Sequence, residues 1–130
     1  MHRLNGRDVL KQLITAYEQE ARLYAGLEEA ARRQRNVLVN GRDPEQLGHL
    51  AEQQRVLAEH IGQIEAAVAP LRAHWEKARD GARAPRVLEL AQLLDRLLED
   101  LADQIHRIVQ IEKANSEALV ALRMPTGACE

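Results

Sequence analysis

The chain has 130 residues, of which 45% are apolar and only 2% aromatic, so it has few of the side chains that favour strands. Its 18 Lys and Arg residues nearly balance 20 Asp and Glu residues, and a formal charge of −2 gives little attraction for nucleic acid. No apolar run approaches the roughly 20 residues of a membrane span, the N-terminus lacks a signal-peptide core, and the single cysteine is Cys129. We therefore expect a cytoplasmic protein without membrane insertion.

A first helix is predicted over residues 8–39. Asn5 suits the N-cap position, because its side chain can accept a hydrogen bond from the first turn. Asn40-Gly41 predicts the end of the helix, with the glycine in the left-handed conformation. Apolar residues recur in steps of three and four, which places them on one helical face: Leu10, Leu13, Ile14, Tyr17, Ala21, Tyr24, Leu27, Ala31 and Leu38.

A second helix is predicted over residues 44–79, with Asp43 as its N-cap and Pro44 in its first turn. Pro70 lacks the backbone N–H for its helical hydrogen bond, so we expect a kink or a split there. Trp75 has two interpretations, a core residue at the end of the bundle or one wall of a partner groove. The heptad positions are Leu47, Gln54, Ile61, Val68 and Trp75, alternating with Leu50, Leu57, Ile64, Leu71 and Ala78.

A third helix is predicted over residues 86–123, after a loop with Gly81 and before Pro125. Residues 125–130 are expected to form a flexible tail. Three helices of similar length, each about 50 Å long and joined by short loops, must pack with neighbours antiparallel. The expected fold is all-α, a single domain over residues 1–130 built as an antiparallel bundle or coiled coil.

The sequence offers no constellation for catalysis. Di-metal sites in helical bundles need Glu-x-x-His on two helices, and the nearest match is the single pair Asp103 and His106. Neither Ser116 nor Thr15 has a base placed beside it by helical spacing. We therefore expect no enzymatic activity, no metal and no cofactor, and a function that depends on binding another protein.

The C-terminal half of the third helix is the most informative region. Gln104, Glu112 and Asn115 are predicted near the centre of its apolar stripe, where unpaired polar groups are costly. One interpretation is an asparagine that fixes helix register, and the other is a surface that is not permanently covered. On the second interpretation, the predicted partner-binding residues are Ile108, Val109, Ile111, Asn115, Leu119, Val120 and Leu122.

Residues 8–122 resemble the FlgN-like flagellar export chaperones. The marks are a Gly-Asp-type turn at 40–43 after the first helix, and Leu47 followed by a run toward a basic residue at 53–55. A late Asn115 then precedes the apolar Leu119. The resemblance implies a cytoplasmic chaperone that binds the C-terminal amphipathic helices of flagellar hook–filament junction (hook-associated) proteins and delivers them to the export apparatus.

Two other functions stay open at this stage. The chain has the composition of a self-associating structural coiled coil, so a homo-oligomer is compatible with the sequence. An adaptor of another secretion or signalling system would have the same amphipathic helices.

Overall fold

The computed structural model describes residues 5–41 and 43–123, with side chains as far as Ala121. It contains three long helices, α1 (Gly6–Asn36), α2 (Pro44–Ala78) and α3 (Pro85–Arg123). A short π-helical turn, η1 (Val37–Gly41), follows α1, and a 3₁₀ turn, η2 (Arg79–Gly81), follows α2. No strand occurs in the described ranges, so the all-α prediction is confirmed. The tail predicted over residues 125–130 lies outside them.

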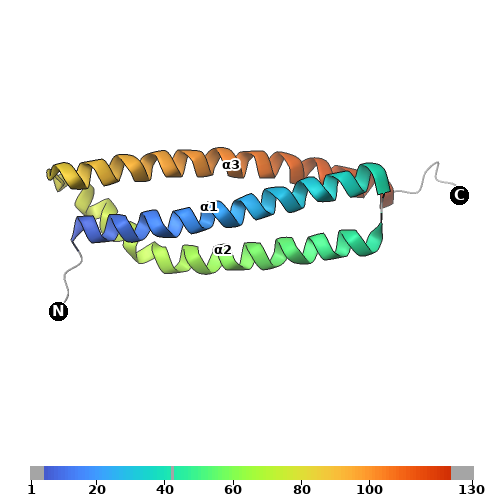
Figure 1. Ribbon diagram of the computed structural model, residues 1–130, viewed down its shortest axis with the longest axis horizontal. Coiled ribbons are helices and arrows are strands. Elements are labelled where there is room, and N and C mark those ends of the chain that lie inside the picture. The colour runs from blue at the N-terminus through green and yellow to red at the C-terminus, as the bar shows by residue number, and fades with distance from the viewer. Residues whose placement is uncertain (1–4, 42, 124–130) are drawn as a thin grey trace, which may run out of the picture.

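The helices form an antiparallel bundle in which α1 is central. Figure 1 shows α1 between α2 and α3, with consecutive helices running in opposite directions. α1 contacts both of the other helices extensively. The beginning of α1 therefore lies beside the end of α2 and the beginning of α3. At the other end of the bundle, the end of α1 lies with the beginning of α2 and the end of α3 (Figure 1).

The predicted N-caps of α1 and α2 are confirmed. The Asp8 backbone N–H donates to the Asn5 side-chain oxygen at 2.8 Å, and the Glu45 N–H donates to an Asp43 carboxylate oxygen at 3.0 Å. Pro44 occupies the first turn of α2, where its missing N–H costs no hydrogen bond. These caps supply acceptors for the N–H groups that a helix start leaves free.

The end of α1 differs from the prediction. The helix does not stop in a left-handed glycine, because Gly41 has no positive φ and residues 37–41 widen into a π-helical turn. Val37 and Leu38 are both buried in this turn, and Val37 packs in a cluster with Ala30 and Leu50. Burial of these two side chains, rather than glycine conformation, accompanies the end of the helix.

Pro70 bends α2 without dividing it. The helix is continuous from Pro44 to Ala78, so of the two expected outcomes, a kink and a split, the split is wrong. In Figure 1 the last turns of α2, in yellow-green, leave the line of the rest of the helix and cross behind α1 toward the beginning of α3. The missing N–H of proline is the usual cause of such a bend.

The main core lies at the end of the bundle where α1 begins. Trp75 is buried there, which confirms its interpretation as a core residue. Two smaller apolar clusters follow toward the other end, one around Leu27, Ile61 and Ile108 and one around Ala30, Val37 and Leu50. The main cluster combines large side chains from all three helices: Val9, Leu10, Leu13, Ile14, Tyr17, Val68, Trp75, Leu90, Leu94 and Leu101.

Candidate protein-binding surface

The second half of α3 holds the residues that the sequence analysis assigned to a partner. After Leu101, the only buried side chains of α3 up to Ala121 are Ile108 and Asn115. Ile111 and Leu119 are half-buried, whereas Val109 is 55% exposed and Val120 is 53% exposed. The side chain of Leu122 lies outside the described part of the chain. Of the seven predicted contacts, four are therefore wholly or partly accessible: Val109, Ile111, Leu119 and Val120, which we call the client surface.

Ile108 and Asn115 belong to the interior of the bundle. Ile108 is in the apolar cluster with Leu27 of α1 and Ile61 of α2. Asn115 donates from Nδ2 to the Ala31 carbonyl oxygen at 2.9 Å. A partner cannot reach either side chain while the helices stay packed, so both support the surface from behind.

The polar residues predicted in the apolar stripe divide into two groups. Gln104 and Asn115 do lie on the packed face, and each donates its amide to a backbone carbonyl of α1. Glu112 is exposed, so its predicted place near the centre of the stripe is wrong. The packed face runs through Ile108, Ile111 and Asn115, and the 100° step after Ile111 turns Glu112 toward solvent.

The side-chain amide of Asn115 has one atom without a hydrogen-bond partner among the described residues. Its Nδ2 also lies 3.3 Å from Oε1 of Gln34, but its buried Oδ1 accepts no hydrogen bond from the described residues. A carbonyl oxygen in a helix has a second lone pair, so Ala31 can accept this bond without losing its helical partner. The amide thus links α3 to α1 by a hydrogen bond and leaves one buried oxygen unpaired.

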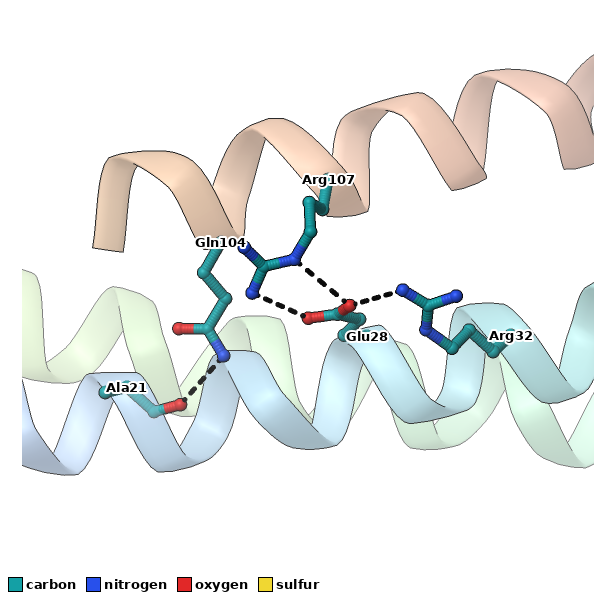
Figure 2. Close-up of polar contacts among 5 residues, drawn as sticks. All are labelled: Ala21, Glu28, Arg32, Gln104 and Arg107. Atoms are coloured by element: carbon teal, nitrogen blue, oxygen red, sulfur yellow. Dashed lines mark hydrogen bonds and ion pairs between the residues drawn. The ribbon is translucent and has the colours of Figure 1, made fainter. Parts of the chain in front are cut away.

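An ion pair joins the same two helices nearer their middle. Figure 2 shows Glu28 of α1 between two guanidinium groups, those of Arg32 on the same helix and Arg107 on α3. The Arg32 bond is 2.7 Å long, and the two Arg107 contacts are 3.4 Å. These two arginines lower the pKa of the Glu28 carboxyl, the hydrogen bond from Arg32 most strongly. Figure 2 also shows Gln104 donating to the Ala21 carbonyl, at 3.3 Å.

A groove between α1 and α2 opens at the same end of the bundle, and the sequence analysis did not predict it. It has a volume of about 730 Å³ and an apolar floor that includes Ala30, Leu50 and Leu57. Gly26 also lines it, where an added Cβ would come within 3.2 Å of a Leu57 methyl. Charged side chains such as Glu29 and Arg33 form its rim. The signal in the sequence was the pair of small residues Gly26 and Ala30, four positions apart on α1, which line the groove with Leu50 and Leu57 of α2.

A buried acidic group lies between the main core and this end, and it too was missed. Glu20 of α1 is 1% exposed, and one of its oxygens has no hydrogen-bond partner in the described structure. Burial, and after it the hydrogen bond and the negative charge of Glu65 on α2, raise the pKa of the Glu20 carboxyl to about 8. Arg72 binds both Glu65, at 3.2 Å, and the Tyr17 hydroxyl, at 2.8 Å. At neutral pH Glu20 is therefore mainly the neutral acid.

Metal-ligand clusters and membrane-spanning helices are both absent from the described residues. Within residues 5–41 and 43–123, no group of three or more His, Cys, Asp or Glu side chains is arranged to hold a metal ion. No helix in that part of the chain is long and apolar enough to cross a membrane. What the second half of the bundle does offer is partly exposed apolar area with polar residues around it, the composition of a protein contact.

Comparison with known proteins identifies no relative of this chain. The chain matches no protein-family model, no curated protein and no solved structure.

Proposed function

We propose that this chain is a cytoplasmic export chaperone that binds the C-terminal amphipathic helices of flagellar hook–filament junction proteins before their secretion. The choice of client rests on the resemblance of residues 8–122 to the FlgN-like chaperones. One observation carries the binding site: Val109 and Val120 stay more than half exposed on a helix half that buries only Ile108 and Asn115 up to Ala121.

The surface suits an amphipathic helix for a physical reason. Val109 and Val120 are eleven residues apart and therefore lie on nearly one line along α3, with the half-buried Leu119 between that line and the packed face and Ile111 on the other flank. A client helix with apolar residues at three- and four-residue spacing can cover such a row, and a few anchors supply most of the affinity. The helix of the chaperone is already formed, so binding orders only the client.

The test is calorimetric titration of the full chain with a C-terminal fragment of a hook–filament junction protein. Val109→Asp with Val120→Asp should weaken binding by about thirtyfold or more, because each anchor is worth on the order of 1–2 kcal/mol. Both side chains are exposed, so the melting temperature should change little.

A matched control is Leu88→Asp with Leu93→Asp, which charges two comparably exposed side chains in the first half of the same helix. The control should bind as wild type does. If both double variants bind equally well, the client surface is elsewhere, and the groove at Leu50 and Leu57 is the next site to test. If the unmodified chain binds no junction protein, the proposed function is wrong.

A further inference from the structure

A pair of acidic side chains joins the middle of α1 to the middle of α2. Glu20 of α1 is 1% exposed, whereas the side chain of Glu65 on α2 is 39% exposed. The two carboxyl groups form a hydrogen bond, which requires a proton on one of them. Glu20 is the member that holds the proton, because a buried carboxylate is costly and Glu65 keeps its contacts with water and with the Arg72 guanidinium.

The groups that face Glu20 give it no second partner. Arg72 donates to the Tyr17 hydroxyl at 2.8 Å and to Glu65 at 3.2 Å, but not to Glu20. Tyr17 and Tyr24 are the titratable neighbours on α1. No charged side chain in the described part of α3 shifts the pKa of the Glu20 carboxyl. An ionised Glu20 would therefore lie against the negative charge of Glu65 without a hydrogen-bond donor of the described residues aimed at it.

Pro70, just after this pair, marks a change in how α2 is held. The last turns of the helix pack into the main core with Trp75. Before the proline, residues 44–67 bury only Leu50 and Ile61. Proline removes one helical hydrogen bond and α2 already bends there (Figure 1), so a change in the bend costs less than in an unbroken helix. The earlier part of α2 can therefore move relative to α1 while the last turns stay in the core.

The contact between α1 and α2 is also incomplete beside the acidic pair. A hollow of about 280 Å³ lies between the two helices, lined by Gln19, Arg22, Leu23, His60 and Ile64. Gln19 and Ile64 are the chain neighbours of Glu20 and Glu65, so the hollow is at the level of the pair. A small separation of the helices there would admit water to an ionised carboxylate, which water stabilises strongly.

We propose that the Glu20–Glu65 pair is a pH-dependent latch between α1 and α2. The protonated pair holds the helices together, and ionisation opens the contact along residues 44–67 of α2, with Pro70 as the hinge. The short connection between α1 and α2 limits the movement, so this segment stays beside α1. Opening uncovers the buried Ile61, so the latch sets how much apolar surface the chain presents. The inference does not depend on the proposed client.

The direction of the pH dependence follows from where the proton is held. The pKa of Glu20 is about 8 while the contact is closed, and its ordinary value of 4.5 applies once water reaches the carboxyl. Between these two values the open form gains up to about tenfold over the closed form per pH unit. Above pH 8 both forms are ionised, so the ratio levels off.

The test is native-state hydrogen exchange of the full chain at pH steps from 5 to 9, with each rate divided by the intrinsic exchange rate at that pH. Amides of residues 57–67 should be at least about tenfold less protected than those of residues 71–77, because a local opening needs less free energy than global unfolding. Their protection should fall by up to about tenfold per pH unit and level off above pH 8.

Two variants remove the latch in different ways. Glu20→Gln keeps a neutral hydrogen-bonding side chain, so the protection of residues 57–67 should become independent of pH. Glu65→Gln should reduce the pH slope as well, because its amide can donate to an ionised Glu20. If Glu20→Gln does not fold, Glu65→Gln carries the test. Circular dichroism at each pH checks that the variants are helical.

Glu59→Gln is the matched control, since Glu59 is an exposed glutamate on the same segment of α2 and pairs with Arg55. It should keep the pH slope of the wild type. Equal protection in the two segments of α2 would mean that the contact opens only when the whole chain unfolds. That result, a wild-type chain without a pH slope, or a slope that persists in the folded glutamine variants would each overturn the proposal.

Discussion

The two ends of the bundle are held together by different kinds of contact. At the end where α1 begins, large side chains from all three helices form the main core, among them Leu10, Trp75 and Leu94. At the end where α1 stops, small residues such as Ala30 pack with Leu50, and the amide of Asn115 replaces an apolar neighbour. The same helices therefore form a firmly packed anchor at one end and a looser end that keeps apolar area for contacts with other proteins.

This difference follows from where the large apolar residues are placed. At the looser end Val39, Val56, Val109 and Val120 point outward and are each at least half exposed. Apolar surface removed from water contributes about 25 cal/mol per Å², so these residues stabilise the bundle little while they stay exposed. A partner that covers these side chains would gain the free energy of removing their apolar surface from water, which folding of the chain alone does not provide.

The largest expected effect comes from removing a large side chain at the anchored end. Leu10→Ala should lower the free energy of unfolding by about 3–5 kcal/mol, because Leu10 is fully buried and its neighbours cannot collapse into the space. Leu50→Ala, at the looser end, should cost about 2 kcal/mol, since Leu50 lines the groove and water can occupy the vacated volume.

Urea unfolding followed by circular dichroism at 222 nm measures both variants. Equal losses would remove the distinction between the ends. A larger loss for Leu50→Ala would reverse it.

The second expected effect concerns the acidic group between the two ends. The folded-state pKa of Glu20 is about 8, above the ordinary value of 4.5, so the folded chain holds a proton that the unfolded chain releases. The stability from this group is fully present below about pH 4.5 and is lost as the pH rises toward 8. Around it, Glu65 and Tyr17 face the carboxyl together with the Arg72 guanidinium, which opposes the shift.

Glu20→Gln keeps the shape of the neutral acid but cannot ionise, so its free energy of unfolding should depend less on pH between 5 and 9. The measurement is a series of urea unfolding curves at pH steps across that range. Glu18→Gln, an exposed change on the same helix, is the control and should follow the wild type. If the curves of Glu20→Gln and wild type run parallel, Glu20 does not hold its proton in the folded state.

Local rules were sufficient for most of the fold. The Asn5 and Asp43 caps depend only on residues within one turn. The apolar periodicity predicts α2 and α3 because the regular helical rotation of about 100° per residue continues along both helices. The end of α1 could not be predicted in this way. Val37 and Leu38 are buried in the wider turn, and that burial is a tertiary contact.

The site could be predicted only in part, for a related reason. Val109 and Val120 are exposed as the sequence analysis expected, because they lie beside the apolar stripe and not within it. The prediction for Glu112 was wrong, since a small error in the angular position of the apolar face around the helix axis moves a residue from the packed face to solvent. Glu20 gave no signal, because its burial depends on Glu65 and Arg72, which are 45 and 52 residues later in the chain.

The smallest expected effect tests the amide at the looser end. Asn115 is buried, its Nδ2 bonds the Ala31 carbonyl, and its Oδ1 has no partner among the described residues. Asn115→Leu removes the unpaired oxygen and leaves Ala31 with its helical hydrogen bond, so we expect the bundle to gain about 1 kcal/mol. Asn115→Ala should instead lose about 1 kcal/mol, because it removes the bond and leaves a cavity. Both are measured by urea unfolding, and a leucine variant less stable than the alanine variant would show that the amide is needed for packing. If the register of α1 and α3 depends on this amide, hydrogen exchange at the end of α3 should also quicken in the leucine variant despite its higher global stability.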